Sequence, residues 1–174
     1  IRTLHDDLLQ RSGGNWEAPP NAVAWEPVHR ALRDAVIDGF AAEPYWGFKD
    51  PRTLFCLEGW LEALPQLQCV AIVRHPEEVA RSLQQRNGMP LAQGLLIWQR
   101  YNTRLLLWLE RLHCPLLHFG ADAQMFLGQA SGLIRSLGLP RALQPEDLRF
   151  HDGQLRHQEQ RGDALPAEIR DLYE

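Results

Sequence analysis

Apolar residues recur at intervals of three and four positions over most of the chain, which is the spacing of helices that bury one face. The pattern predicts helices over residues 1–11, 27–40, 53–64, 91–112 and 123–137, with others that open at residue 76 and after residue 166. Gly13 and Gly14 end the first helix, and Pro27 and Pro76 stand at the first positions of two others, where proline is favoured.

Three shorter segments have the composition of strands: residues 45–48, 69–73 and 116–119. Residues 69–73, CVAIV, are apolar throughout, as expected for a strand of a parallel sheet that is covered on both faces. The order of helices and strands predicts an α/β fold with a mostly parallel sheet of three visible strands and helices on both of its faces.

The length of 174 residues is typical of one domain, so we expect a single domain over residues 1–174. Residues 144–174 form a polar, irregular tail apart from the last short helix. The helical rhythm begins at Ile1 itself, and three strands are few for this many helices. We therefore expect a first strand upstream of Ile1, so that the domain is truncated at its N-terminus.

Composition and charge argue against several classes of protein. The net charge is −4 and the chain has no basic run, which argues against a nucleic-acid partner. The apolar runs are too short to span a bilayer and no signal peptide opens the chain, so we expect a cytoplasmic protein without a transmembrane segment. Cys56, Cys69 and Cys114 are widely spaced in apolar surroundings, and we expect buried free thiols rather than a metal site or a redox pair.

Positive side chains follow two of the predicted strands. Lys49, the only lysine beside seventeen arginines, follows residues 45–48, and Arg74 follows residues 69–73. Ligands of parallel sheets bind beyond the carboxyl ends of the strands, so we expect both cations to face one crevice. The helix after Arg74 presents free backbone N–H groups to an anion, and Ser82 adds a hydroxyl. This combination predicts a phosphate or sulfate pocket.

Two simpler interpretations of these residues stay open. One is a surface ion pair of Arg74 with Glu77 or Glu78. The other is that KDPR, residues 49–52, forms only a turn, because Asp-Pro favours turn initiation.

The segments WGFKDPR and VRHPEEVARSL together resemble the sulfotransferase family that uses 3′-phosphoadenosine 5′-phosphosulfate (PAPS), in particular its bacterial and tyrosylprotein-type branches. The resemblance implies a three-layer P-loop-like fold and an enzyme that moves a sulfuryl group from PAPS to a hydroxyl or amine acceptor. It also implies that Arg74 and Ser82 hold the 3′-phosphate and that Lys49 contacts the sulfuryl group. GLLIWQRYN and the tail FHDGQLRHQ also resemble the bacterial branch, and the tail offers Arg156 and His157 as further ligands.

The chain departs from this family in two places. The Ser/Gly/Thr-rich loop that holds the 5′-phosphosulfate in the family is not found, because SGG, residues 12–14, ends a helix rather than opening one. We expect that loop upstream of Ile1, and we expect residues 1–174 alone to bind PAPS weakly. In addition, HFGADAQ, residues 118–124, stands where relatives carry an acidic stretch.

Sulfuryl transfer needs a cation on the leaving oxygen and a base for the acceptor proton, and it needs no metal. A compact ammonium follows the leaving oxygen better than a planar guanidinium does, so our hypothesis is that Lys49 stabilises the leaving group and that arginine cannot replace it. His5 is the local candidate for the base, with Asp6 beside it. Each residue has a structural alternative: Lys49 pairs with Asp50 or a glutamate, and His5 and Asp6 lie on a solvated helix face.

Two other classes of protein fit the same pattern. A P-loop-type kinase shares the layers but needs a GxxxxGK[ST] loop, which residues 1–174 do not contain. A non-catalytic nucleotide-binding or scaffold domain that kept the fold is the other. No motif selects the acceptor among small molecules, saccharides and peptides, or sets the oligomeric state.

Overall fold

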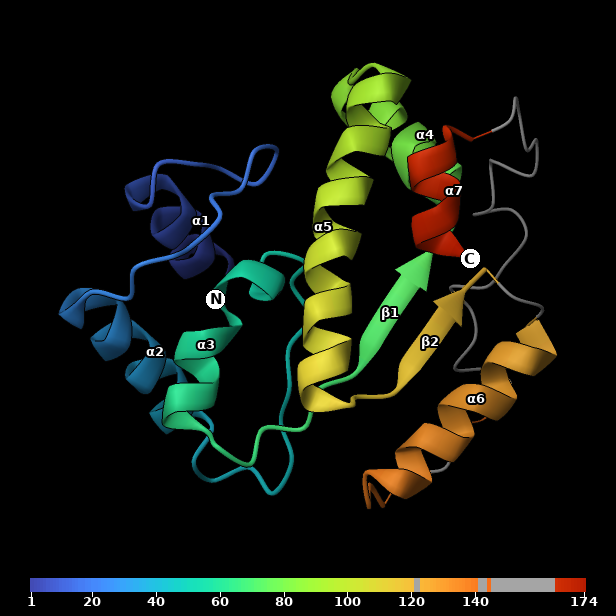
Figure 1. Cartoon of the computed structure of the whole chain (residues 1–174). Helices are drawn as coiled ribbons and strands as arrows, with labels where there is room; N and C mark the ends of the chain where they lie inside the picture. The colour runs from blue at the N-terminus through green and yellow to red at the C-terminus, as the bar shows by residue number, and fades with distance from the viewer. Residues whose placement is uncertain (121–122, 141–143, 145–164) are drawn as a thin grey trace. The chain divides into compact units, whose positions relative to one another are not determined.

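The computed structural model describes residues 1–120, 123–140, 144 and 165–174, which divide between two compact units. The first unit is Ile1–Leu67 and the second is Gln68–Glu174 (Figure 1). Among the described residues, the regular structure of the first unit is entirely helical, whereas the second combines strands with helices.

Three helices form the first unit, and the first and third supply its buried apolar residues, whereas the buried residues of the second are His29 and Arg33. They are α1 (Arg2–Arg11), α2 (Pro27–Gly39) and α3 (Thr53–Ala63). Leu8 and Leu9 of α1 and Trp60 of α3 are fully buried, and α1 contacts both other helices. The three helices predicted for this part of the chain are confirmed, with ends that agree to within one residue.

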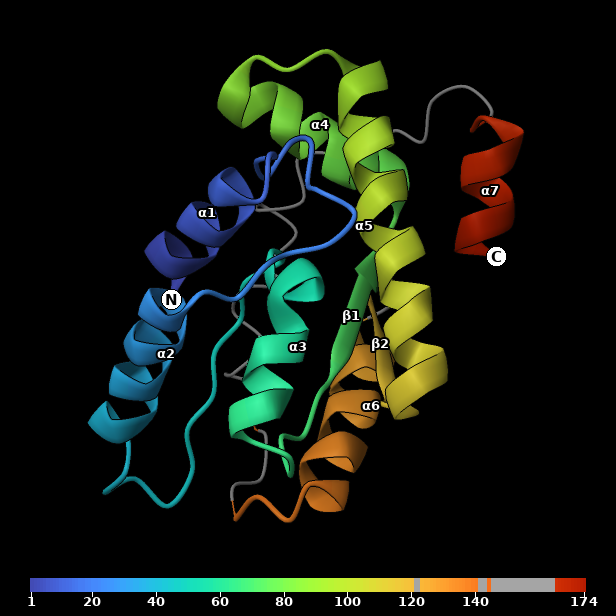
Figure 2. The same cartoon turned by 60° about the vertical axis from the view of Figure 1, so that its left-hand side comes forward.

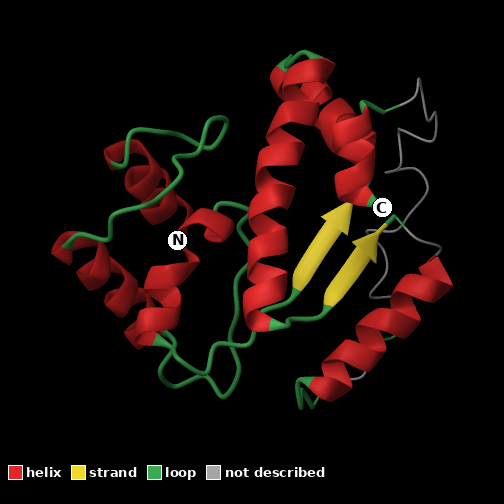
Figure 3. Ribbon diagram, in the orientation of Figure 1, coloured by secondary structure: helices red, strands yellow, loops and turns green. Residues whose placement is uncertain are grey.

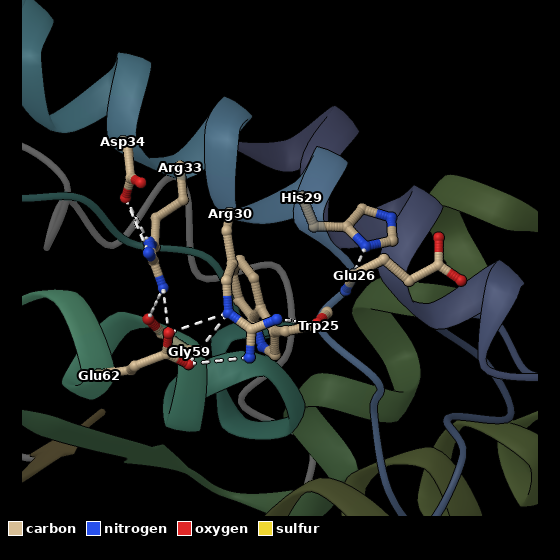
Figure 4. A network of polar contacts seen from close by, with 8 residues as sticks. All are labelled: Trp25, Glu26, His29, Arg30, Arg33, Asp34, Gly59 and Glu62. Atoms are coloured by element: carbon tan, nitrogen blue, oxygen red, sulfur yellow. Dashed lines mark hydrogen bonds and ion pairs between the residues drawn. The ribbon is translucent and has the colours of Figure 1, made fainter.

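Arginine side chains of α2 reach across to α3 (Figure 4). Arg30 forms an ion pair with Glu62, with Nε 2.9 Å from Oε1, and it also donates to the backbone carbonyl of Trp25. The buried Arg33 donates to the carbonyl oxygen of Gly59 over 2.5 Å. A Cβ at Gly59 would overlap the indole of Trp25, so glycine is required for this close approach. These contacts fix α3 against α2.

The segment between α2 and α3 is not a strand, so the prediction for residues 45–48 is wrong. It has no regular secondary structure from residue 46 to residue 50 and pairs with neither strand of the described sheet (Figure 3). Its aromatic rings pack in series, with centroid distances of 5.0 Å for Phe40 and Trp46, 6.4 Å for Trp46 and Phe48, and 4.7 Å for Phe48 and Trp60. The apolar pattern that indicated a strand therefore reflects aromatic packing against α3.

The second unit contains a parallel pair of strands. β1 (Ala71–Arg74) pairs with β2 (Leu116–Phe119), in a register that sets Ala71 opposite Leu116 (Figure 1). The bounds predicted for β2 are confirmed, whereas β1 begins and ends later than the predicted residues 69–73. The α/β class and the parallel pairing are confirmed, but the described residues form a sheet of two strands and not three.

Four helices accompany this sheet in the described part of the second unit. They are α4 (Pro76–Asn87), α5 (Leu91–Leu112), α6 (Ala123–Ser136) and α7 (Ala167–Tyr173). A short connection joins α4 to α5 (Figure 2). A Cβ on Gly94 of α5 would lie 2.8 Å from the Cα of Ala80, so the glycine allows the two helices to pack closely.

Helices pack on both faces of the sheet. Val73 of β1 lies in a core cluster with Trp98 of α5 and Ile169 of α7. Leu117 of β2 lies in a separate cluster with residues of α6, among them Phe126. Successive strand residues point to opposite faces, and residues in register point to the same face. Val73 pairs with the residue after Leu117, so the two clusters lie on opposite faces.

Within the described part of the second unit, the cover over β1 is incomplete on one face. Ile72, which pairs with Leu117, is 51% exposed, whereas Ala71 and Val73 are buried. The reason is that α6 packs against β2 rather than β1. For the face that carries Ile72, the prediction that residues 69–73 are covered on both faces stays a prediction.

Within the described ranges, no helix combines the length and the apolar character needed to cross a membrane. The longest described helix, α5, carries four charged residues, among them Arg100 and Arg104. The cytoplasmic location and the absence of a nucleic-acid partner stay predictions.

Candidate functional site

Lys49 lies in the loop that leads into α3, and its side chain is exposed. Among the described residues, it takes part in no hydrogen bond or ion pair. The alternative in which Lys49 pairs with Asp50 is not seen, because other donors bind the carboxylate of Asp50. The ammonium of Lys49 is therefore available to a ligand.

Asp50 accepts hydrogen bonds from His5 and Arg52. His5 Nδ1 lies 3.0 Å from Oδ2, and the backbone N–H and Nη1 of Arg52 donate to Oδ1 over 3.1 and 3.0 Å. The side chain of Asp50 is only 8% exposed. Burial by itself would raise its pKa, but the hydrogen bonds from His5 and Arg52 outweigh burial and lower the pKa of Asp50 to about 2. Asp50 is thus a fixed carboxylate that closes the turn before α3.

Three consecutive polar residues of α1 hold separate partners. Besides His5, Asp6 forms an ion pair with Arg52, with 2.6 Å between Oδ1 and Nε. Asp7 Oδ2 lies 3.0 Å from His29 Nε2 in α2, and this hydrogen bond lowers the pKa of Asp7. α1 therefore connects the KDPR turn and α2 through neighbouring side chains.

His5 is fully buried, and both of its ring nitrogens have partners. The indole Nε1 of Trp60 donates to His5 Nε2 over 2.9 Å, so Nε2 accepts and Nδ1 carries the proton that is donated to Asp50. A general base needs a lone pair within reach of the proton that it removes. This geometry favours a structural role, and the catalytic role of His5 stays a prediction. The alternative of a solvated helix face is wrong for His5.

Arg74 is the last residue of β1 and lies at the carboxyl end of the sheet. Its Nε donates to Glu78 Oε2 over 2.7 Å, and its guanidinium lies over the ring of Phe119, 5.4 Å from the centroid. The ion pair that was one interpretation of Arg74 is therefore present. The side chains of Arg74 and Glu78 are 31% and 28% exposed, so solvent and dissolved ligands reach this pair.

Ser82 lies on the same face of α4 as Glu78, because residues four apart in a helix are neighbours on its surface. Ser82 is half-buried. Since Arg74 binds Glu78, the structure brings Arg74 and Ser82 to one side of α4. The first turn of α4 holds the carboxylates of Glu77 and Glu78, which already interact with its dipole. An anion at this position would therefore compete with Glu78.

The end of β2 lies beside the Arg74–Glu78 pair. Gly120 follows β2 with φ 104°, and a Cβ on it would lie 3.5 Å from Glu78 Oε2. The pair is thus close to the carboxyl ends of both strands, which is where ligands of parallel sheets bind.

Three further predictions concern the C-terminal tail, the end of α1 and metal binding. Arg156 and His157, the further ligands implied by FHDGQLRHQ, lie outside the described residues. Residues 12–14 end a helix as predicted, with Ser12 as the C-cap of α1 and φ 82° at Gly13. In the ranges that the structure describes, His, Cys, Asp and Glu side chains form no group of three or more that is suited to a metal ion.

Lys49 and Arg74 belong to different units, and the expectation that they face one crevice stays a prediction. Part of its basis is wrong, because no strand precedes Lys49.

The hydrogen-bond network around Asp50 was not predicted from the sequence. A signal for it was present, because helical spacing places His5 with Leu8 and Leu9 on the apolar face of α1. A buried histidine needs hydrogen-bond partners. The pattern therefore indicated that hydrogen-bonding groups from elsewhere in the chain approach His5.

Comparisons of the chain with family models, with curated proteins and with solved structures find no match. The resemblance to sulfotransferases therefore depends on short sequence motifs alone. The fold and the site define a coarser class, which is an α/β protein with parallel strands and an arginine–glutamate pair at their carboxyl ends.

Proposed function

We propose that this chain is a PAPS-dependent sulfotransferase domain of three-layer, P-loop-like fold, which moves a sulfuryl group from PAPS to a hydroxyl or amine acceptor. The observation that carries the proposal is the division of roles within KDPR. Asp50 and Arg52 bind α1 and each other, while Lys49 stays exposed and has no partner among the described residues. A lone ammonium on a firmly held turn suits the stabilisation of charge on a transferred group.

In this proposal Lys49 contacts the bridging oxygen between sulfur and the 5′-phosphate. The acceptor attacks sulfur, the bond to the bridging oxygen breaks, and negative charge develops on the leaving phosphate, by analogy with phosphoryl transfer. The ammonium is a compact charge on a flexible stem and can follow that oxygen. A guanidinium at the same position would present a larger planar fork that fits the transition state less well.

Arg74 and Ser82 bind the 3′-phosphate of the nucleotide in this proposal. The guanidinium is suited to phosphate because its donors match two oxygens at once. The phosphate replaces Glu78 as the partner of Arg74. That exchange costs little, because a partly exposed ion pair contributes about 0–1 kcal/mol.

His5 is left out of the proposed chemistry, because its two nitrogens serve Asp50 and Trp60. The base that accepts the proton of the acceptor is not assigned. No observation favours a kinase or a non-catalytic scaffold over a PAPS-dependent sulfotransferase.

The experiment is a thermal-shift titration of the natural full-length protein with 3′-phosphoadenosine 5′-phosphate and, separately, with AMP, which lacks the 3′-phosphate. A ligand at a hundred times its Kd stabilises by about 2.7 kcal/mol, which raises Tm by roughly 5–10 °C. We expect such a shift with the bisphosphate and a smaller one with AMP.

Arg74→Ala should remove the preference for the bisphosphate over AMP. Arg81→Ala is the matched control, because it removes an arginine of α4 that pairs with Glu77 and not with Glu78. No shift in the wild-type protein, or the same preference in Arg74→Ala as in the wild type, would contradict the proposed nucleotide site.

A further inference from the structure

Two of the three cysteines stand at the amino ends of the paired strands. Cys69 lies two residues before Ala71 and Cys114 lies two residues before Leu116, and Ala71 is opposite Leu116 in the register. Counting back along both strands sets Cys69 opposite Cys114. The backbone N–H of Ala71 donates to the carbonyl of Pro115 over 2.9 Å, so the strands are still side by side next to the two cysteines.

The end of the hydrogen-bonded ladder at this point has a simple cause. Pro115 has no N–H, so it cannot donate to the carbonyl of Cys69, which would be the next bond of a parallel ladder. Cys69 and Cys114 therefore lie just beyond the last bonded pair, where the backbone is less constrained than in the centre of the sheet.

The spacing of the strands suits a disulfide. Neighbouring strands lie about 4.8 Å apart, which is inside the Cα separation of roughly 4.4–6.8 Å that disulfides require. Residues in register also point to the same face of the sheet. Both thiols are half-buried and free, so small molecules in solution can reach them.

The electrostatics of the two thiols agree with this proximity. Burial raises the pKa of Cys69, and the neighbouring Cys114 raises it further. Burial also raises the pKa of Cys114. The thiols are therefore mainly protonated at neutral pH and react slowly with oxidants until one of them loses its proton.

We propose that Cys69 and Cys114 are a thiol pair that closes to a disulfide by exchange with a small-molecule disulfide such as oxidised glutathione. One cysteine thiolate attacks the glutathione disulfide, forms a mixed disulfide and releases one glutathione thiolate. The second cysteine then attacks the protein sulfur of that mixed disulfide and releases the other glutathione. Two protein thiols are oxidised, and one oxidised glutathione is reduced to two thiols, which take up the two protons.

The covalent loop encloses β1, α4 and α5, which is most of the described second unit. The bond joins the amino ends of the strands, whereas Arg74 and Glu78 lie at the carboxyl ends. Closing the loop restricts the unfolded chain, so it raises Tm by roughly 5 °C or more. This inference does not depend on the proposed function, because none of its measurements involves PAPS.

Cys56 supplies the internal control. It is fully buried in α3 of the first unit. Its burial therefore predicts little reactivity while the protein is folded.

The test incubates the folded full-length protein with oxidised glutathione, blocks the remaining thiols with an alkylating reagent and identifies linked peptides by mass spectrometry. We expect a peptide that links Cys69 to Cys114 within one chain, formed at a rate independent of protein concentration, and a higher Tm that a reducing agent reverses. Cys69→Ser and Cys114→Ser should each retain a glutathione adduct on the remaining cysteine and lose the rise in Tm. Cys56→Ser should behave as the wild type does.

Three results would overturn the inference. One is that Cys69 and Cys114 both stay open to alkylation after prolonged oxidation. Another is that glutathione adducts persist on both without closure. The third is a link that forms only between chains, with a rate that rises with protein concentration.

Discussion

The KDPR turn and the β1–α4 junction each carry one cation of the proposed nucleotide site, but the surroundings of the two cations differ. In the turn, Asp50 and Arg52 are bound by α1 and Lys49 has no partner among the described residues. At the junction, Arg74 itself is bound by Glu78. The described residues thus leave one cation without a partner and hold the other with a carboxylate that an anionic ligand would have to replace.

Burial explains why the partners of Asp50 should be harder to separate than Arg74 and Glu78. The side chain of Asp50 is 8% exposed and has several donors around it, so removing one donor leaves a buried charge without compensation. The side chains of Arg74 and Glu78 are 31% and 28% exposed, and water solvates either one after separation. The first set is therefore costly to break, whereas the second can separate at little cost.

The largest effect on stability is expected from Asp50→Asn. The amide of asparagine would present its NH₂ group to Arg52 or to His5, both of which are donors, and so a buried donor would lose its partner. We expect a loss of about 2–4 kcal/mol in the free energy of unfolding, measured by urea denaturation.

Asp171→Asn is the matched control, because Asp171 pairs with an arginine, Arg170, and both side chains are exposed, by 73% and 50%. Its change in unfolding free energy should stay within about 0.5 kcal/mol. Equal losses of unfolding free energy in the two variants would contradict the distinction between buried and exposed ion pairs.

Acid should weaken the KDPR turn over a defined range. The folded-state pKa of Asp50, about 2, lies below the ordinary value of 3.8, so the folded state binds its proton less readily than the unfolded state does. The stabilising effect is complete above pH 3.8 and is lost as the pH falls towards about 2. Unfolding free energies measured over this range should fall more steeply for the wild type than for Asp50→Asn.

The variant still contains Asp7, whose pKa is also lowered, and it therefore keeps part of the acid sensitivity. Identical slopes in the two proteins would show that Asp50 does not have a lowered pKa in the folded state.

A smaller effect is expected at the Arg74–Glu78 pair, where a substitution should change the affinity for a nucleotide. Glu78→Gln removes the carboxylate that competes with a phosphate for Arg74, so the affinity for 3′-phosphoadenosine 5′-phosphate should rise by about fivefold, equivalent to roughly 1 kcal/mol. Isothermal titration calorimetry measures this change.

Glu77→Gln removes the same charge from the same turn of α4 but leaves Arg74 paired, since Glu77 contacts Arg81. Its gain should be clearly smaller. Equal gains would mean that only the net charge of the turn matters, and a loss of affinity in Glu78→Gln would show that Glu78 helps rather than competes.

The helices could be predicted from sequence because each has a long periodic pattern with a proline or glycine at an end. The failure at residues 45–48 has a physical cause, since a short apolar run looks the same whether it pairs with a strand or stacks its rings on a helix. Phe48 packs on Trp60, and nothing in the local sequence shows that contact. The exposure of Ile72 also depends on where α6 packs and not on β1 itself.

The site could be predicted only in part. The end of β1 at Arg74 and the position of Ser82 in α4 follow from local pattern. The bond between His5 and Asp50 joins residues 45 positions apart, and it needs the fold of three helices to form. The same holds for Cys69 and Cys114, which were expected to be isolated buried thiols and are half-buried neighbours across two strands.

The central claim is that the KDPR turn serves the fold through Asp50 and Arg52 and serves the chemistry through Lys49. The most direct test is the rate of sulfuryl transfer from labelled PAPS by the full-length Lys49→Arg variant, measured together with its urea midpoint. We predict a turnover lower by roughly 10²–10³-fold with an unchanged midpoint, because Lys49 is exposed and the described residues give it no partner. Near-normal turnover with arginine at this position would contradict the claim.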